Sequence, residues 1–186
     1  SGGEDGARYG PSIMPGGDPT AWPPVRDIFR AIAARADDGE PCCRWVGEGG
    51  AGHYVKMIHN GIEYGMMQAY AEGFALLQAK EEFGLDLAQI GDIWEHGSVV
   101  RSWLLDLTTA ALRENPGMTD IAPYVPDSGE GRWTVFESID LNVAANVAGM
   151  PVEELLGLNA GHRRWATRPD GPHELLLPKA KAGAFE

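Results

Sequence analysis

The stretch Gly50–Gly65, GAGHYVKMIHNGIEYG, decides how this chain is organised, because a helical pattern there carries most of the polar chemistry. It opens a run over 51–80 that is rich in Ala, Met, Leu, Gln and Glu and holds no proline. Apolar residues recur along the run every three or four positions. They are Val55, Ile58, Ile62, Met66, Tyr70, Phe74 and Leu77. The run predicts one helix over 51–80, and its length favours a central, buried position.

Three polar residues of this run share one helical face. Lys56, Asn60 and Glu63 stand at i, i+4 and i+7. At 1.5 Å per residue, Lys56 and Glu63 are about 10 Å apart along the axis, which suits a small substrate held between them. An amine removed from water gives up its proton readily and can act as a base, and a carboxyl in an apolar site can act as an acid. His59 and Tyr64 flank this face.

Plainer interpretations of these residues stay open. The same face could be exposed polar surface. His59 and Glu63 have the i, i+4 spacing of metal-binding helices, but no second histidine or cysteine cluster accompanies them, so we expect no metal. Cys42 and Cys43 are adjacent, which argues against a bond between them and favours small buried hydrophobes.

The amino-terminal side of the helix has the pattern of a βαβ fragment. Residues 1–17 are rich in glycine and predict a loop, with a short strand near 11–14. This first loop has neither the GxGxxG nor the GxxxxGK[ST] pattern. We expect Asp18 to cap a helix over 19–36. A strand over 42–46 and a second glycine loop over 47–52 follow.

The carboxy-terminal side predicts shorter helices. Two are expected over 86–96 and 100–114, and a loop dominates 119–132. Helical patterns return over 134–147 and 152–158. The remaining expectations are a turn over 159–161, further turns over 163–172 and a short strand over 173–177.

Composition excludes some classes of function. The 186 residues carry 15 basic and 27 acidic side chains, a net charge of −12, which argues against nucleic-acid or anionic-membrane binding. No apolar stretch approaches the ~20 residues of a membrane span. The absence of a disulfide framework and of a signal peptide predicts a cytoplasmic protein. The start at Ser1, without methionine, predicts a piece of a longer protein.

Residues 1–17, SGGEDGARYGPSIMPGG, and 39–65, GEPCCRWVGEGGAGHYVKMIHNGIEYG, resemble the decarboxylating 6-phosphogluconate dehydrogenases of the pentose phosphate pathway. The resemblance covers roughly 1–145. It implies a mainly α fold: the end of a Rossmann-like α/β domain, then the family's helical domain. The implied domains are a remnant of the NADP-binding domain over 1–47 and the helical substrate and dimerisation domain over 48–145.

The resemblance also implies an enzyme activity and roles for individual residues. The family is an NADP-dependent oxidoreductase that converts 6-phosphogluconate to ribulose 5-phosphate, and it works as a homodimer without a metal. Lys56 would be the catalytic base and Glu63 the catalytic acid. The implied substrate-binding residues are Ser1, Gly2, Gly3, His59, Asn60 and Tyr64. Tyr64 would contact the phosphate. Because the family's dinucleotide domain is largely absent, we expect this isolated chain to be inactive.

One loop departs from the family pattern. The family carries a phosphate-binding lysine in an NKGTGKW-type sequence, whereas this chain reads DSGEGRW over 127–133. Ser128 takes the place of the lysine, and Arg132 is the available substitute cation.

A second resemblance begins near Ile139. Residues 139–186 are similar to the LysM-like region of membrane-bound lytic murein transglycosylases of the D type. This implies a small tail of foreign origin over 146–186, and hence a chimera of two proteins. The alternative function is therefore a noncatalytic, peptidoglycan-associated binding piece or an inactive helical chimera.

Overall fold

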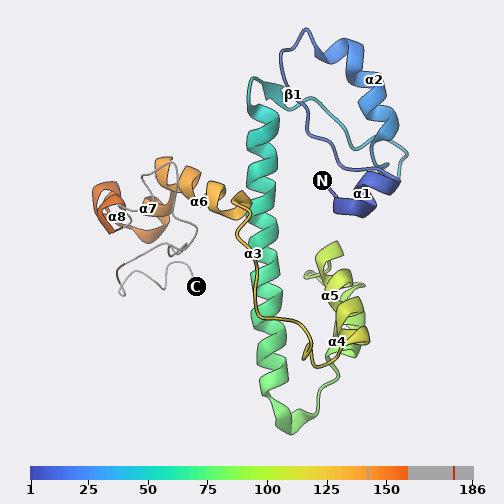
Figure 1. The fold of residues 1–186 in the computed structure, drawn as a ribbon, viewed down its shortest axis with the longest axis vertical. Coiled ribbons are helices and arrows are strands. Elements are labelled where there is room, and N and C mark those ends of the chain that lie inside the picture. Colours follow the sequence, from blue (N-terminus) through green and yellow to red (C-terminus); the bar gives the residue numbers. More distant parts are fainter. Residues whose placement is uncertain (142, 159–177, 179–186) are drawn as a thin grey trace. The chain divides into compact units, whose positions relative to one another are not determined.

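A computed structural model describes residues 1–141, 143–158 and 178, which fold mainly as helices (Figure 1). The elements, in order, are α1 (Gly3–Tyr9), β1 (Gly16–Gly17), α2 (Trp22–Ile32), β2 (Gly47–Glu48), α3 (Ala51–Ala79), the 3-10 turn η1 (Glu81–Phe83), α4 (Leu87–Trp94), α5 (Trp103–Glu114), α6 (Glu130–Asp140), α7 (Val143–Ala148) and α8 (Val152–Leu158). They form two compact units. Unit 1 is 1–61 with 129–186, and unit 2 is 62–128.

Unit 1 begins with the expected βαβ fragment. Strands β1 and β2 pair in parallel, with Gly16 opposite Gly47, and α2 lies between them in the chain. An isolated parallel bridge joins Ile13 to Cys43 and extends the pairing. The strand predicted near 11–14 is therefore reduced to one bridging residue, and β2 starts just after the predicted 42–46.

Helix α2 is shorter than the predicted 19–36, and Asp18 is not its cap. The Asp18 carboxylate instead accepts hydrogen bonds from the backbone N–H and the hydroxyl of Thr20, which closes a turn before the helix. Prolines occupy the first turn of α2, where their missing N–H costs nothing. Trp22 stacks on Phe29 at 6.2 Å between ring centroids, and Trp45 packs on Trp22 at 5.8 Å.

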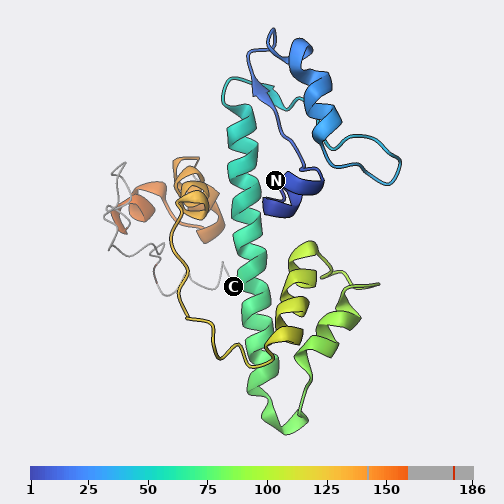
Figure 2. The same cartoon turned by 45° about the vertical axis from the view of Figure 1, so that its right-hand side comes forward.

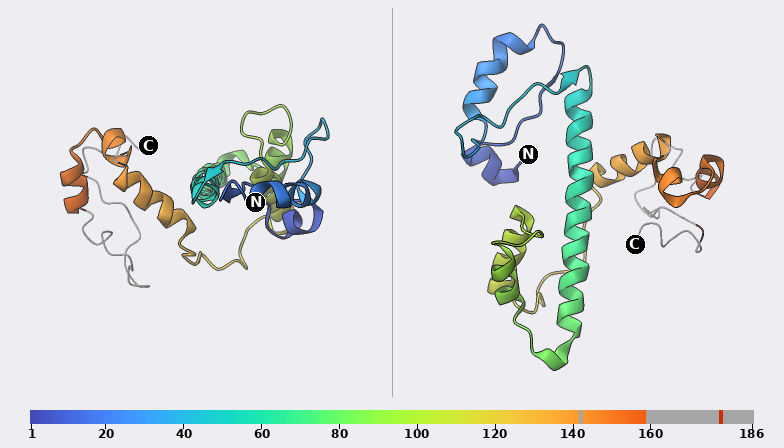
Figure 3. Two further views of the ribbon diagram at one scale, coloured as in Figure 1. Left: turned by 90° about the horizontal axis from the view of Figure 1, so that it is seen from above. Right: turned by 180° about the vertical axis from the view of Figure 1, so that it is seen from behind.

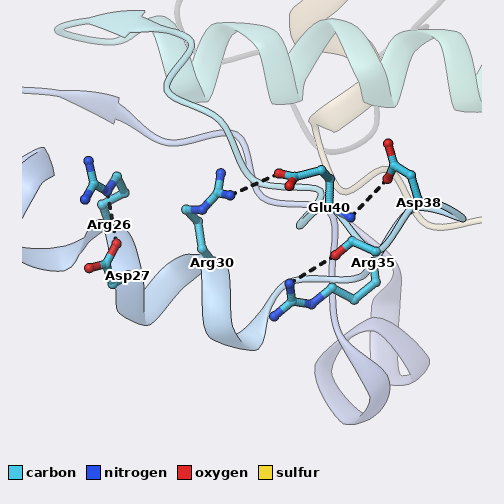
Figure 4. Close-up of polar contacts among 7 residues, drawn as sticks. Arg26, Asp27, Arg30, Arg35, Asp38 and Glu40 are labelled. Carbon is cyan, nitrogen blue, oxygen red and sulfur yellow. Dashed lines mark hydrogen bonds and ion pairs between the residues drawn. The ribbon is translucent and has the colours of Figure 1, made fainter.

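The segment after α2 turns back on itself through polar contacts (Figure 4). Arg30 pairs with Glu40 at 3.1 Å, and Arg35 donates to the Gly39 carbonyl at 3.2 Å. The Asp38 carboxylate accepts from the Glu40 N–H. These bonds close a short loop that leads the chain into Cys43 and β2.

The prediction of a loop over 1–17 is wrong for Gly3–Tyr9, which form α1. Gly2 and Gly3 have φ of 122° and 58°, and Gly10 has φ of 118°, so glycine freedom is used to enter and to leave the helix. A side chain at Gly6 would lie 2.9 Å from the Ser1 carbonyl oxygen. Gly6 is therefore a glycine because the Ser1 carbonyl lies so close, and not because it belongs to a loop. The high glycine content of 1–17 alone does not distinguish these two cases.

Helix α3 confirms the long helix predicted over 51–80 and ends one residue earlier (Figure 2). The prediction that it is buried is wrong, since only Asn60 and Phe74 of its residues are buried. Several apolar side chains along it are exposed, including Ile62 at 62% and Leu76 at 74%. With 29 residues, α3 is far longer than any other described helix, so its neighbours cannot cover its whole length.

Unit 2 is built on the pair α4 and α5. Asp86 caps α4 by accepting from the Gln89 N–H, and Ser102 caps α5 by accepting from the Leu105 N–H. The buried core consists of Phe74, Leu105 and Leu112. Both helices were predicted: the end of α5 at Glu114 agrees, and the other three ends were placed one to three residues further out.

Helices α6, α7 and α8 form a cluster of short helices in unit 1 (Figure 3). The predicted helix over 134–147 instead starts at Glu130, inside the predicted loop, and α6 ends at Asp140 before α7 begins. The cluster's buried core is Ile139, Ala144, Ala145, Ala148, Met150 and Leu155. Helix α8 has the predicted bounds. The turns and strand predicted over 159–177 lie outside the described residues.

Candidate functional site

The first turns of α3 bring three of the predicted site residues together. The Lys56 ammonium donates a hydrogen bond to the Asn60 side-chain oxygen, one turn along the helix. The His59 Nδ1 lies 3.3 Å from the same oxygen. Asn60 is only 6% exposed, and Lys56 and His59 are half-buried. The sequence spacing predicted that Lys56 and Asn60 share a face, and the bond between them joins the two side chains.

Ser1 extends this set from the other end of the chain. Its hydroxyl lies 3.2 Å from His59 Nε2. Because the Asn60 oxygen can only accept, Nδ1 of His59 carries the proton there, and in the neutral ring Nε2 accepts from the Ser1 hydroxyl. A continuous polar chain therefore runs from Ser1 through His59 and Asn60 to Lys56.

Gly2 and Gly3 follow Ser1 directly and have only backbone groups to offer a ligand. The Gly2 carbonyl accepts from the Gly6 N–H, and α1 begins at Gly3. The predicted substrate loop over 1–3 thus leads directly into a helix. This local turn fixes the direction in which the chain leaves Ser1.

Glu63 and Tyr64 lie further along α3, in unit 2. Glu63 is half-buried, and Tyr64 is 37% exposed. The Tyr64 hydroxyl lies 3.2 Å from the hydroxyl of Ser128, the residue in the place of the family's lysine. Tyr64 and Ser128 are therefore brought together, as expected if both belong to one polar group.

Helix α6 supplies a contact to α3 that the sequence did not predict. Arg132 lies half-buried in its first turn. Two residues later, the Thr134 hydroxyl donates to the Met57 carbonyl oxygen at 2.8 Å. A Cβ on Gly61 would lie 2.9 Å from the Thr134 Cβ. A glycine inside a strong helical pattern, at position 61, was the signal that could have indicated this close approach.

The second glycine loop has a spacing that the sequence reading overlooked. Gly47, Gly49 and Gly52 fit G-x-G-x-x-G between a strand and a helix. The Gly49 N–H donates to the Gly17 carbonyl, and a Cβ on Gly52 would lie 2.6 Å from the Met14 carbonyl oxygen. Gly47 and Gly52 allow close packing against Ala51 and Met14, whereas Gly49 has open space beside it and a φ of 56° that favours glycine. Backbone packing and a positive φ therefore account for this glycine spacing without reference to a dinucleotide.

Two titratable groups have displaced pKa values. Burial raises the pKa of the Cys43 thiol, partly opposed by the nearby Arg30 charge. Hydrogen bonds from Thr20 lower the pKa of Asp18. Cys43 is 1% exposed, as expected for a small buried hydrophobe, whereas Cys42 is only half-buried, and both are free thiols.

Away from the predicted site residues, the described part of the chain contains a cavity in unit 2 but no metal cluster. No group of three or more His, Cys, Asp or Glu side chains that could hold a metal ion occurs among the described residues. A cavity of about 410 Å³ in unit 2 is lined by residues that include Leu77, Lys80, Asp86 and Leu112. None of the predicted site residues lines it. In the part of the chain that the structure describes, no helix has the length and apolar character needed to span a membrane.

Known protein families match nearly the whole chain. The short α/β segment and the helices that follow it agree with two successive domains of one enzyme family. Residues 1–47 match the NAD binding domain of 6-phosphogluconate dehydrogenase, and residues 52–154 match the 6-phosphogluconate dehydrogenase C-terminal domain. Residues 132–186 match the LysM-like domain of lytic transglycosylase MltD, so the two models overlap over 132–154.

Individual relatives agree with the family models. The decarboxylating 6-phosphogluconate dehydrogenases of Caenorhabditis elegans and Ovis aries are 46% and 43% identical over 158 and 159 residues. Each match covers 82% of this chain and 32% of the relative. A solved Plasmodium falciparum 6-phosphogluconate dehydrogenase, described as apo and in complexes with NADP+ and 6-phosphogluconate, matches with a TM-score of 0.66 and 34% identity. It covers 76% of this chain and 32% of that one. The chain belongs to the 6-phosphogluconate dehydrogenase family and spans about a third of the length of these relatives.

Proposed function

We propose that this chain supplies substrate-side groups for the oxidative decarboxylation of 6-phosphogluconate to ribulose 5-phosphate. The family match over 52–154 and the activity for which the relatives are named support this proposal. The observation that carries it is the polar chain from Ser1 to Lys56, centred on the buried Asn60. Such a chain holds an amine, an imidazole and a hydroxyl in one place, where a polyhydroxy acid can bind them.

The roles proposed for the side chains follow from where each proton goes during the reaction. The Lys56 amine takes the proton of the substrate's 3-hydroxyl while the hydrogen on carbon 3 departs as hydride. The resulting β-keto acid loses carbon dioxide, and the Lys56 ammonium returns its proton to the carbonyl oxygen, giving an enediol. Glu63 then protonates carbon 1 of the product while the Lys56 amine takes back the proton of the carbon 2 hydroxyl, which gives ribulose 5-phosphate. Asn60 and His59 bind the substrate's hydroxyl groups, and no metal is required.

The remaining contacts concern the two anionic ends of the substrate. The segment Ser1–Gly3 would bind the carboxylate. Tyr64 would bind the phosphate together with Ser128, and Arg132 would add positive charge. Because the chain has a net charge of −12, these local groups must provide the attraction that long-range electrostatics does not.

NADP is the proposed hydride acceptor. The match of 1–47 to the family's NAD binding domain and the NADP+ complex of the Plasmodium relative support it. Since only residues 1–47 match the NAD binding domain and the chain spans about a third of its relatives' length, we expect the purified chain to bind 6-phosphogluconate but not to reduce NADP. An increase in absorbance at 340 nm with both compounds present would contradict this expectation.

Calorimetric titration with 6-phosphogluconate tests the function directly. We expect saturable binding, weaker binding of gluconate, which lacks the phosphate, and weaker binding of glucose 6-phosphate, which lacks the carboxylate. The variant Lys56→Met should weaken binding at least tenfold, the loss expected for a charged hydrogen-bond donor. Lys80→Met, at the residue that directly follows α3, is the matched control and should bind as the parent does. Equal binding of all three compounds would remove the support for this function.

We also propose the domain division, the assembly and the compartment. Residues 1–47 are the remnant of the NADP-binding domain, 48–145 the helical domain, and 146–186 a LysM-like tail of foreign origin. Exposed apolar side chains on α3, such as Ile62 and Leu76, favour a homodimer, and the enzyme class is typical of the cytoplasm. Size-exclusion chromatography with light scattering should give about twice the 20.0 kDa chain mass. A monomer at micromolar concentration would contradict the dimer.

A second candidate function rests on the tail. Residues 132–186 match the LysM-like domain of a lytic transglycosylase, which supports binding to peptidoglycan. Sedimentation with purified murein sacculi tests it, and truncation after residue 141 should abolish any binding. Retention by sacculi of the truncated chain would show that the tail is not responsible.

A further inference from the structure

The turn of α3 that carries Lys56 and Asn60 is held by a residue of α6. Thr134 donates its hydroxyl hydrogen to the Met57 carbonyl oxygen at 2.8 Å. In an α-helix this carbonyl already accepts the N–H of residue 61, so the hydroxyl uses its second lone pair. Met57 follows Lys56, and Gly61 follows Asn60. The hydroxyl is thus attached to the same helical turn as the polar chain.

Gly61 makes this contact possible. A Cβ at Gly61 would lie 2.5 Å from the Thr134 methyl and 2.8 Å from its hydroxyl oxygen. Residue 61 lies about 100° around the helix from Asn60, so Thr134 contacts the flank of the polar face and not the face itself. Any larger residue at 61 would push Thr134 away from the Met57 carbonyl.

Helix α6 is itself fixed on its other side. Val135 and Ile139 pack into the apolar cluster formed with α7 and α8, and Ile139 is only 4% exposed. Thr134 therefore projects from a helix that is anchored by packing. From the opposite side of the same turn, the Ser1 hydroxyl contacts His59.

We propose that Thr134 is a positioning residue, which sets the helical turn 56–61 and so the placement of Lys56 and Asn60 toward the substrate. This rests on the proposed function, because the substrate readout depends on 6-phosphogluconate binding. Thr134 acts through two separate contacts, the hydrogen bond from its hydroxyl to the Met57 carbonyl and the packing of its methyl group against Gly61. They can be removed separately.

Three variants separate these parts. Thr134→Val keeps the shape and removes the hydroxyl, and Thr134→Ser keeps the hydroxyl. Gly61→Ala displaces the threonine. The matched control is Thr108→Val, since the Thr108 hydroxyl bonds only to Leu104, within its own helix, at 2.8 Å. Thermal melts establish that each variant folds before it is compared.

Hydrogen exchange of the amides over 57–61 is the readout that does not depend on substrate. We expect Thr134→Val and Gly61→Ala each to accelerate exchange about fivefold, the factor for one hydrogen bond of ordinary strength, and Thr134→Ser and Thr108→Val to leave it within twofold. Combining the two accelerating changes should add little, because they break one contact. Unchanged exchange in Thr134→Val would overturn the proposal.

The dissociation constant for 6-phosphogluconate is the second readout. It should rise about fivefold in Thr134→Val and return to near the parent value in Thr134→Ser. If exchange accelerates while the dissociation constant stays the same, Thr134 holds the turn without positioning the substrate groups, and the proposal fails. If the parent chain does not bind 6-phosphogluconate, the proposed function fails, and a fivefold exchange effect would still support the hold on the turn.

Discussion

Each unit of the chain brings a helical glycine against a threonine of another helix, and the two contacts differ in where the hydroxyl bonds. In unit 1 the Thr134 hydroxyl bonds across to α3, at Met57. In unit 2, Thr109 of α5 packs on Gly91 of α4, but its hydroxyl bonds back to Leu105 in its own helix at 2.9 Å. The unit 2 contact serves packing alone, whereas the unit 1 contact also joins two helices by a hydrogen bond.

The two threonines also differ in how deeply they are buried. Thr109 is 0% exposed and Thr134 is half-buried. A fully buried threonine cannot turn aside without disturbing the core, whereas a half-buried one can rotate toward solvent. We therefore expect unit 2 to respond to changes of size and unit 1 to respond to the loss of a hydroxyl group.

The largest effect is expected for Gly91→Ala. The new methyl group would meet all three side-chain atoms of Thr109 beyond the backbone, in a core that cannot relax. Overpacking of this kind should lower the free energy of unfolding by about 2 kcal/mol. Urea denaturation followed by circular dichroism measures it. Gly73→Ala is the control, since a Cβ there meets nothing within 4 Å, and it should be neutral or slightly stabilising.

A smaller loss is expected for Gly61→Ala. Thr134 can swing away, so the cost is mainly the bond to Met57, about 1 kcal/mol, partly offset by the helix propensity of alanine. The same denaturation experiment measures it. If Gly61→Ala destabilises the chain as much as Gly91→Ala, Thr134 is as rigidly packed as Thr109, and the comparison between the two contacts is wrong.

A still smaller effect is expected for Thr109→Val. The shape of the side chain is preserved, and the Leu105 carbonyl keeps its helical hydrogen bond, so the free energy of unfolding should change by at most about 0.5 kcal/mol. Denaturation midpoints of Thr109→Val and Thr134→Val, measured side by side, test this. A larger loss in Thr109→Val than in Thr134→Val would show that the back-bonded hydroxyl matters more than the cross-helix bond.

The smallest effect concerns pH and reports on unit 1 alone. Burial raises the pKa of Cys43, so the folded chain holds the thiol proton at a pH where the unfolded chain releases it. This contribution to stability is full below the unfolded thiol value of about 8.5 and is lost as pH rises through the folded value. In a Cys42→Ser background, iodoacetamide labelling at pH 8 should be slow and should accelerate on unfolding. Gly91→Ala should not change the labelling rate, and rapid labelling of the folded Cys42→Ser chain would contradict the burial of Cys43.

Periodicity predicted the parts of the fold that local sequence determines. The apolar spacing over 51–80 placed α3 to within one residue, and the pattern over 152–158 placed α8. Composition failed where glycine serves packing, as at Gly6 in α1 and near Gly129, after which α6 begins. A glycine-rich stretch looks like a loop until the close neighbour that requires the glycine is known.

The candidate site was predictable only along one helix. Helical geometry placed Lys56 beside Asn60, because the two are one turn apart in sequence. The contact of Thr134 with Met57 joins residues 77 positions apart, which no local pattern encodes. Similarly, Ser1 and His59 are separated by 58 positions and needed the family resemblance to be associated.

The two-sided packing of α6 has a consequence for how such chains can be recombined. Its Thr134 side is committed to α3, and its Val135 and Ile139 side is committed to the α7–α8 hairpin. The matches to the two protein families overlap over 132–154, a range that includes most of α6. Any replacement of α7 and α8 would therefore have to cover Val135 and Ile139 to leave the Thr134 contact with α3 undisturbed.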